Sequence, residues 1–367
     1  METINNVSIV NTSSVRNSSI ELLRIFAALG VVILHYNGMG KAMEFSSGFS
    51  HQVLTVLECL CVCAVDLFIM ISGYFLCTSQ KRTWDKPVYL LLLLSFISVI
   101  CYIVKYWGNI NIITIAHLFI PPHNYFVLLY VTLYIVSPYF NIVLSKLNAK
   151  DRTVLIVILM LLFSVYPTLM DSYQLVMHQE YMGISPVGAW GQQHGYTIVG
   201  FSLCYCLGGW LRMNNIAARL TNRNVLILIV VLLLCIYVWY NVEKHTVLHN
   251  SVSLIDYNAL SYSNPLVLAL TFLLLLLFSK IHFQNKFINV MAKATFVCYI
   301  FHLNVIPVLQ VEAFAQIGGI RLFIHLALSV CLIYILSWGW WWLLDIILYP
   351  VKKSLKDKVI FNLCEKS

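Results

Sequence analysis

Two side chains near the N-terminus, Arg24 and His35, flank a run of ten uncharged residues, IFAALGVVIL. On a helix, eleven positions correspond to about three turns plus 20°, so both side chains lie on one face, roughly 16 Å apart along the axis. Histidine, with an unperturbed pKa of about 6.5, can accept and return a proton at neutral pH. Arginine stays charged and offers fixed donors to a phosphate or a developing oxyanion. The pair is therefore a candidate for general-base catalysis combined with anion binding.

Each member of this pair also has a structural interpretation. Arg24 lies about one turn inside the apolar segment, so its guanidinium can extend to lipid head groups with Glu21, at position i−3, as its partner. His35 lies near the far end of the segment, where a neutral histidine can be hydrogen-bonded at the interface. An ionisable side chain near the bilayer centre usually faces a bundle interior or a water-filled cavity. Because the two groups share a face, the sequence favours a functional pair.

A second group of candidate residues follows in the next apolar segment and the loop after it. Asp66 lies inside CAVDLFIMISGYFL, and an intramembrane carboxylate is a functional candidate that could pair with Arg24, orient His35 or bind a substrate hydroxyl. Ser72 lies near the cytoplasmic end of this segment and, like Asp66, is a candidate for a channel or an acceptor-binding site. The basic residues that follow form a candidate clamp for an anionic donor: Lys81, Arg82 and Lys86.

Three further side chains are weaker candidates for a channel or an acceptor-binding site. Tyr130 and Tyr134 are four positions apart and share a helix face. His302 lies inside a late apolar segment. Core packing explains the tyrosines equally well, and a packed, hydrogen-bonded histidine explains His302.

The composition defines the elements that must position these residues. Of the 367 residues, 60% are hydrophobic and only 10% are charged, whereas a soluble globular protein carries about 25% charged residues. The mean hydropathy is +0.83. The chain is therefore predicted to be an all-α polytopic integral membrane protein. Its eleven cysteines show no spacing typical of metal ligands, so no metal site and no bound cofactor are expected.

A membrane-spanning helix needs about 20 mostly apolar residues. Ten runs meet or approach this length, of which the sixth is short and the last is long. They lie near residues 20–38, 53–77, 86–104, 125–145, 153–170, 197–211, 224–241, 262–279, 294–311 and 322–348.

The basic residues fix the expected orientation of these spans, because cytoplasmic loops carry an excess of Lys and Arg. With ten spans, nineteen of the 23 Lys and Arg residues fall on the side of both termini, which is therefore predicted to be cytoplasmic. This distribution explains the net charge of +8 without a nucleic-acid partner. The expected organisation is a disordered lead without a signal peptide (1–19), a ten-helix membrane domain (20–348) and a basic cytoplasmic tail (349–367). The four basic residues on the other side are Lys41, Lys105, Lys244 and Arg321.

The long loops on the non-cytoplasmic side, 105–124, 171–196 and 242–261, are rich in aromatic and amide side chains, as in PVGAWGQQHGY. Such residues suit a carbohydrate surface, because aromatic rings stack on sugar faces and amides bond hydroxyls. Ordinary polar loops with interfacial aromatic residues explain the same composition.

Four segments, in this order, resemble the membrane-bound acyltransferase 3 family: ELLRIFAALGVVILH, VDLFIMISGYFL, YFVLLYVTLYIVSPYFN and CYIFHLNVIPV. The resemblance implies a cytoplasmic acyl-CoA donor, usually acetyl-CoA, and transfer of the acyl group to a glycan hydroxyl. It implies that Arg24 and His35 are the essential pair and that Arg82 and Lys86 belong to a donor-binding loop. This chain departs from the family in having Tyr125 where Trp is frequent, and fewer basic residues after the second span.

The function expected from sequence is therefore O-acylation, most simply O-acetylation, of a surface or lipid-linked glycan by a multi-pass enzyme of the cell inner membrane. Succinyl transfer and a non-glycan acceptor stay open, as does a homo-oligomer or an association with polysaccharide-synthesis machinery. A transporter is the main alternative, because intramembrane Arg, His and Asp can couple proton movement to export. Against it, the sequence shows no internal repeat. A scaffold without chemistry of its own is the second alternative.

Overall fold

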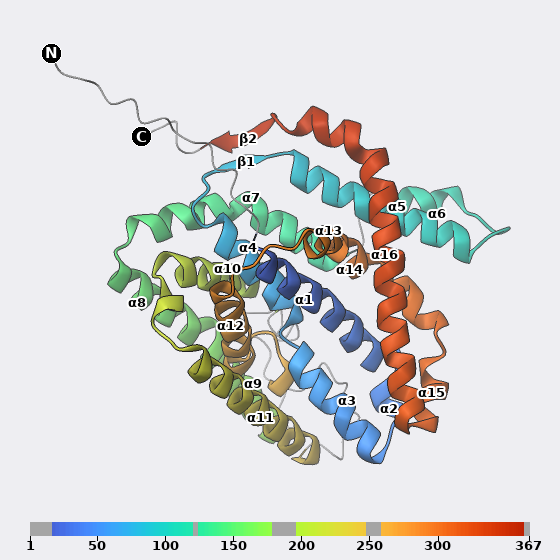
Figure 1. The fold of residues 1–367 in the computed structure, drawn as a ribbon, viewed down its shortest axis with the longest axis horizontal. Coiled ribbons are helices and arrows are strands. Elements are labelled where there is room, and N and C mark those ends of the chain that lie inside the picture. Colours follow the sequence, from blue (N-terminus) through green and yellow to red (C-terminus); the bar gives the residue numbers. More distant parts are fainter. Residues whose placement is uncertain (1–16, 120–123, 178–195, 247–257, 363–367) are drawn as a thin grey trace.

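The computed structural model describes residues 17–119, 124–177, 196–246 and 258–362. Nearly all of this part is helical, and the helices form one bundle (Figure 1). The helices that build it are α1 (Ser18–Asn37), α3 (Gly48–Cys61), α4 (Ala64–Leu76), α5 (Asp85–Lys105), α7 (Tyr125–Lys146), α8 (Ala149–Met160), α9 (Tyr166–Met177), α10 (Ile198–Met213), α11 (Asn222–Thr246), α12 (Pro265–Lys280), α14 (Thr295–Val305) and α16 (Gly319–Leu355).

The remaining elements are short. They are the helices α2 (Ala42–Phe45), α6 (Ile112–Phe119), α13 (Lys286–Met291) and α15 (Val311–Ile317), the π turn η1 (Leu161–Val165), the 3-10 turns η3 (Ile216–Ala218), η5 (Asn258–Leu260), η6 (Ala292–Ala294) and η7 (Ile306–Val308), and the strands β1 (Lys81–Thr83) and β2 (Val359–Asn362).

The predicted spans are present in the expected order. Within the described residues, nine helical segments are long and apolar enough to cross a membrane, and α10 is a tenth, shorter apolar helix. This confirms the prediction of an all-α polytopic membrane protein. The boundaries of the first and last spans differ from the expected ones, because α1 already begins at Ser18 and α16 continues to Leu355.

Two spans that the sequence suggests as continuous are interrupted. The second is divided by a turn at Val62 and Cys63 into α3 and α4, so that Asp66 lies in the first turn of a new helix. The fifth contains the π turn η1 just before Pro167. A proline removes one helical hydrogen bond and its ring crowds the carbonyl four residues earlier, which accounts for this interruption.

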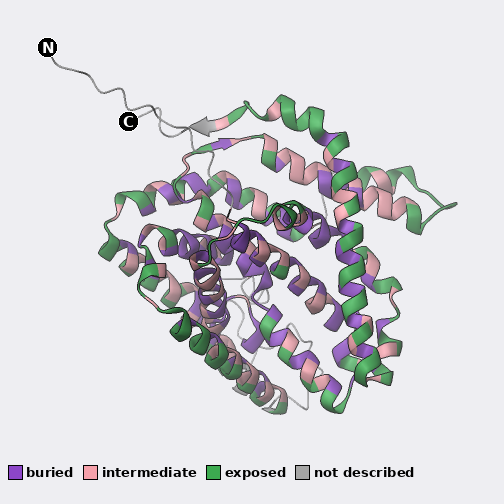
Figure 2. Cartoon of the chain, viewed as in Figure 1, coloured by how far each residue is buried: buried purple, intermediate pink, exposed green. Residues whose placement is uncertain are grey.

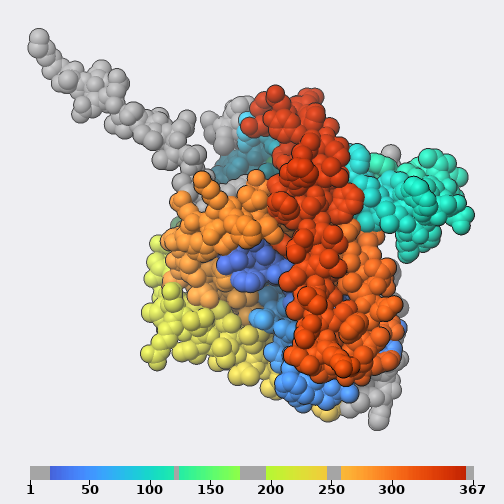
Figure 3. Space-filling view, turned by 45° about the vertical axis from the view of Figure 1, so that its right-hand side comes forward, coloured from blue at the N-terminus to red at the C-terminus, as the bar shows by residue number. Residues whose placement is uncertain are grey.

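The outer surface of the bundle is apolar, as a bilayer requires. Along α11 and α16 many exposed residues are large hydrophobic ones (Figure 2). On α11 these include Leu226, Ile227, Val230, Val231, Leu234, Val238 and Val242. In Figure 3, α16 runs the height of one face, and α5 and α6 project beside it.

Helix α1, which carries Arg24 and His35, lies in the middle of the bundle against α3, α4, α12, α14 and α16 (Figure 1). Small residues permit this position: Ala27 and Ala28 are buried, and a Cβ at Gly30 would lie 3.1 Å from the Cβ of Ala64. The helix that carries the candidate pair is therefore enclosed by other helices over most of its length.

Helices α4 and α10 make the closest backbone approach near the site. A Cβ at Gly73, in the SGY motif, would collide with the backbone of Tyr205, and a Cβ at Gly208 would collide with that of Met70. The two glycines thus allow α4 to lie directly on α10, and this contact sets the position of Ser72 one residue earlier.

Contacts between distant segments place several predicted cytoplasmic parts on one side. The side chain of Asn17 donates to the carbonyl of Ile281, 3.1 Å away, in the loop after α12. Strand β1, after the second span, pairs antiparallel with β2 near the C-terminus, and Figure 1 shows the two strands together. The start of α1 therefore lies beside the loop after α12, and β1 lies beside the C-terminal strand, as the ten predicted spans lead us to expect.

Candidate active site

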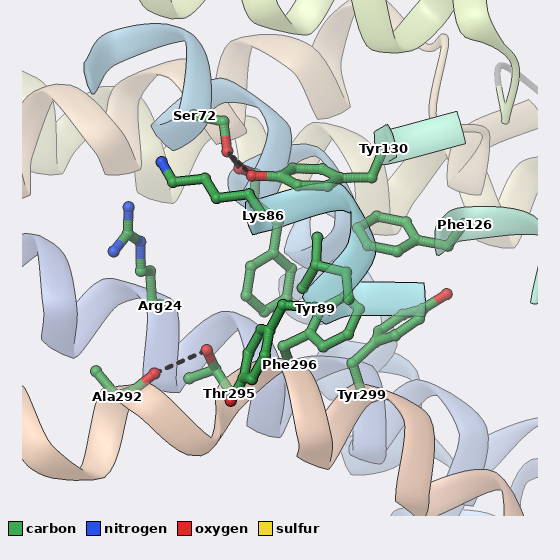
Figure 4. Close-up of a pocket in the computed structure, with 12 residues that line it drawn as sticks. Arg24, Ser72, Lys86, Tyr89, Phe126, Tyr130, Ala292, Thr295, Phe296 and Tyr299 are labelled. Atoms are coloured by element: carbon green, nitrogen blue, oxygen red, sulfur yellow. Dashed lines mark hydrogen bonds between the residues drawn. The ribbon is translucent and has the colours of Figure 1, made fainter. Parts of the chain in front are cut away.

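A cavity of about 250 Å³ opens between α1, α4, α5, α7 and α14 (Figure 4). It lies toward the side that carries β1 and β2, because Lys86 of its wall comes three residues after β1. Its lining residues are Arg24, Phe68, Ser72, Lys86, Tyr89, Leu90, Phe126, Tyr130, Ala292, Thr295, Phe296 and Tyr299.

One end of the cavity is cationic. Arg24 reaches it from α1 and Lys86 from the first turn of α5 (Figure 4). The Arg24 Nη1 donates to both carboxylate oxygens of Glu21, at 3.0 and 3.1 Å, and the guanidinium lies 5.3 Å from the ring centroid of Phe75. The predicted Arg24–Glu21 pair is therefore present, yet the Arg24 side chain remains 30% exposed and borders the cavity. Two cations from different helices converge here on space that an anionic group can enter.

The cavity wall also contains a pair of hydroxyl groups. The Ser72 Oγ donates to the carbonyl of Phe68 at 2.8 Å and lies 3.1 Å from the Tyr130 hydroxyl (Figure 4). Because the serine proton is directed to the carbonyl, Tyr130 donates to Ser72. The structure thus brings together two of the residues that the sequence suggests for a channel.

Beyond the aromatic end of the cavity, the rings form a continuous series. Phe126 and Tyr299 have ring centroids 4.4 Å apart, Tyr299 and His302 5.9 Å, and His302 and His35 4.8 Å. His35 itself lies outside the cavity lining. The two candidate histidines, far apart in the sequence, are therefore direct neighbours behind the wall of the cavity.

The hydrogen bonds of His302 define its protonation pattern. Its Nδ1 lies 3.0 Å from the carbonyl oxygen of Cys298, which can only accept, so Nδ1 carries a proton. The side chain is fully buried, and in the described part of the chain its Nε2 has no hydrogen-bond partner. Since buried polar atoms are nearly always satisfied, this unpartnered nitrogen marks a position for a substrate group or a water molecule.

Arg82 occupies a different place from the one that the donor clamp requires. Its side chain is 1% exposed and does not line the cavity. All three guanidinium nitrogens donate within the protein, to the Tyr134 carbonyl, the Ser137 hydroxyl, the Ser79 carbonyl and hydroxyl, and the Lys81 carbonyl. Arg82 thereby fastens the loop to α7. Of the three basic residues in the predicted clamp, only Lys86 lines the cavity.

Lys81 and Tyr134 also stay outside the cavity lining. Lys81 is exposed on β1. The ring of Tyr134 makes cation–π contacts with two basic side chains. The Arg82 guanidinium lies 5.1 Å and the Lys86 Nζ 5.6 Å from its centroid. Tyr134 therefore helps to position Lys86 without contacting the cavity itself.

Asp66 is buried and has no hydrogen bond to Arg24 or His35 within the described residues. It is 2% exposed, and within the described residues its Oδ2 has no hydrogen-bond partner. The partner of Arg24 is Glu21, and no hydrogen bond in the described part of the chain joins Asp66 to His35. Its carboxyl group interacts with the Cys204 thiol of α10. Of the alternatives for Asp66, the pair with Arg24 is thus absent.

Sequence reasoning missed several residues of the site, notably Tyr89, Phe126 and Tyr299. One signal was available for Tyr299, because it lies one helical turn before His302 and so shares its face. No comparable pattern distinguishes Tyr89 from the apolar residues around it. Among the described residues, no three His, Cys, Asp or Glu side chains converge as metal ligands.

One comparison with known proteins bears on this geometry. A family model described as an acyltransferase domain matches residues 17–345. No curated protein and no solved structure matches the chain. The match includes every residue of the cavity and both histidines.

Proposed function

We propose a specific reaction for this chain, which belongs to the acyltransferase 3 family and is a multi-pass membrane acyltransferase. In this proposal it acetylates a hydroxyl of a surface or lipid-linked glycan, with acetyl-CoA as the donor. The observation that carries the proposal is the sequence of groups along one path. Two cations stand at one end of the cavity, aromatic rings line it, and two histidines follow directly behind its inner wall.

The order of groups along this path matches the order of groups along the donor. Coenzyme A carries phosphates at one end and the thioester at the tip of a long arm. Arg24 and Lys86 can bind phosphate oxygens, since guanidinium and ammonium groups are the usual partners of phosphate. The apolar stretch between Phe68, Phe126 and Phe296 suits the arm. The thioester then lies toward Tyr299 and the histidines.

The proposed reaction uses His35 as general base. It removes the proton from the acceptor hydroxyl, and the oxygen attacks the thioester carbonyl to form the new ester bond. The carbon–sulfur bond breaks, and the protonated imidazole returns its proton to the leaving thiolate, so free CoA and the acetylated acceptor are the products. His302 acts as a positioning residue, because its ring packs against that of His35 and its own Nδ1 is tied to Cys298. Transient acylation of His35 is the alternative course.

The membrane of action is proposed to be the cytoplasmic membrane, with the donor entering from the cytoplasm. The predicted topology assigns nineteen of the 23 Lys and Arg residues to the side that contains the loop with β1, and the cavity lies toward β1. Acetyl-CoA is a cytoplasmic metabolite, and the orientation of the cations in the cavity matches entry from that side.

The first test is transfer of radiolabelled acetyl groups in inverted membrane vesicles that contain the host's glycan acceptor. Wild type is compared with His35→Ala and Arg24→Ala. General-base catalysis contributes about 10²–10⁴-fold, so His35→Ala is expected to leave only traces of transfer. Arg24→Ala is expected to raise the KM for acetyl-CoA.

The outcomes separate the proposal from its alternatives. Near-normal transfer by His35→Ala would refute the catalytic role of this residue. Label retained on wild-type protein would support an acyl-histidine intermediate. Absence of label in every sample, with the acceptor shown to be present, would exclude acetyl-CoA as donor or return the transporter to consideration.

A further inference from the structure

The N-terminal end of α5 supplies two polar residues to the cavity, Lys86 and Tyr89. The C-terminal segment Asp345–Asn362 contacts Tyr89 directly and bonds to Trp84, which immediately precedes α5. All but the first residue of this segment lie beyond the part of the chain that matches the family, which ends at residue 345. The question is what this additional segment does beside the donor end of the cavity.

The first connection is a backbone ladder. Strand β1 pairs antiparallel with β2, with Lys81 opposite Asn362 and Thr83 opposite Val359. The N–H of Trp84 donates to the carbonyl of Lys358 at 3.0 Å. Trp84 is the residue that precedes α5, so the ladder ends where the helix begins. The start of α5 is therefore held directly by the C-terminal strand.

The second connection joins side chains of α5 and α16. The Tyr89 hydroxyl donates to Asp345 Oδ1 at 3.0 Å, and Lys352 Nζ donates to the same oxygen at 3.3 Å. The Lys352 Nζ also lies 4.7 Å from the centroid of the Tyr89 ring. Asp345 and Lys352 are seven positions apart and so lie on one face of α16. Tyr89 is thus fixed from α16 while its ring lines the cavity.

The strand ladder and the contacts of α16 both hold the N-terminal end of α5. A two-stranded ladder is only marginally stable alone, and here α16 leads into one strand while Arg82 anchors the other to α7. We expect a shift of the start of α5 to move Lys86 and Tyr89 more than α1 and α14, which carry the histidines. The geometry predicts an effect on the donor rather than on the chemical step.

We infer that the C-terminal segment Asp345–Asn362 is the positioning element of the donor site. It holds the start of α5 so that Lys86 and Tyr89 face the cavity, and it thereby sets the affinity for the acyl-CoA donor. This inference rests on the proposed function for the identity of that donor.

The test compares three forms of the chain in detergent: the full chain, a chain ending at Asn362, and a chain ending at Lys358, which lacks β2. The measured quantity is the Kd of radiolabelled acetyl-CoA. Removal of β2 is expected to raise the Kd about tenfold, which corresponds to one lost anchoring interaction of ordinary strength. The chain ending at Asn362 keeps the whole ladder and is the matched control, with an unchanged Kd. Equal Kd values in all three forms would overturn the inference.

A second set of variants tests the side-chain connection without truncation. Asp345→Ala and Tyr89→Phe each remove the same hydrogen bond, so each is expected to raise the Kd by a few-fold, and the double variant is expected to show much less than the product of the two effects. Independent effects that multiply would contradict a shared role in positioning.

Hydrogen exchange of residues 81–89 gives a readout that does not depend on the donor. These amides are expected to exchange faster in the chain ending at Lys358 than in the chain ending at Asn362, because β2 no longer protects them. Unchanged exchange would overturn the inference even if the Kd rose. Failure of the wild-type chain to bind acetyl-CoA would refute the proposed donor, whereas the exchange comparison would still decide whether the segment holds α5.

Discussion

At the scale of single residues, chemistry depends on which side chains remain available. Arg82 is buried, whereas the Arg24 side chain is 30% exposed and borders the cavity. The donors of Arg82 are distributed over neighbouring oxygens, whereas Arg24 bonds one carboxylate through one nitrogen. His302 has one nitrogen committed to a carbonyl and the other without a partner in the described part of the chain. The candidate functional groups therefore differ from the structural ones in having nitrogen atoms not fully bonded within the protein, and not in residue type.

Substitution of His302 tests whether its nitrogen or only its ring matters. His302→Phe keeps an aromatic ring against His35 but removes Nε2, and His302→Ala removes both. We expect both variants to reduce the rate of acetyl transfer by about 10²-fold, the scale associated with misplacement of a catalytic group. The Kd for acetyl-CoA is expected to stay within the wild-type range. Full activity of His302→Phe would show that the ring alone is sufficient.

At the scale of helices, the site depends on close approach between α4 and α10. Gly73 and Gly208 remove the side chains that would otherwise separate the two backbones. Small residues at helix contacts are the usual means by which membrane helices approach each other. Ser72 and Phe68 on α4 reach the cavity because α4 is held at this distance.

Gly73→Ala is therefore expected to destabilise the protein by about 1–3 kcal/mol, the range for overpacking a filled interior. The measurement is the thermal unfolding transition of the purified protein in detergent. Gly339→Ala on α16 is the matched control, because a Cβ there meets no atom within 4 Å, and we expect its transition to be unchanged or slightly raised. Equal transitions for both variants would show that α4 and α10 can separate without cost.

At the scale of the whole molecule, the distribution of charge and the contacts between loops agree. Contacts join the start of α1 to the loop after α12 and β1 to β2, and the predicted topology assigns most Lys and Arg residues to the side of these segments. The cationic end of the cavity lies toward this side. The orientation of the protein in the membrane therefore also decides from which side a donor would reach the cationic end of the cavity.

Single cysteines placed at exposed positions next to the spans test the orientation. We expect Asn109→Cys, after the third span, to react with a membrane-impermeant maleimide in intact cells. Lys150→Cys, between the fourth and fifth spans, is expected to react only after the membrane is opened. Both positions are exposed, so accessibility within the protein does not distinguish them. The reverse pattern would place the cationic end of the cavity outside and remove the basis for a cytoplasmic donor.

Much of this molecule follows from its sequence because the bilayer allows few solutions. A run of about 20 apolar residues must satisfy its backbone internally, and in a single chain segment only a helix does so. The same regularity places Arg24 and His35 on one face, since helical periodicity is independent of neighbours. The ordered motifs then identify the family, which the match over residues 17–345 confirms.

Other features were decided only by tertiary packing. Arg82 lies on the short strand β1 and Lys86 in the first turn of α5, so no single periodicity relates the two side chains. Nothing local therefore indicates that Arg82 is buried against α7 and that Lys86 lines the cavity. The contact between His35 and His302 depends on how α1 packs against α14, and the role of Tyr89 depends on α16. Local sequence sets the conformation of each helix, but the neighbours of a side chain are set by where distant helices meet, and the active site is made of such neighbours.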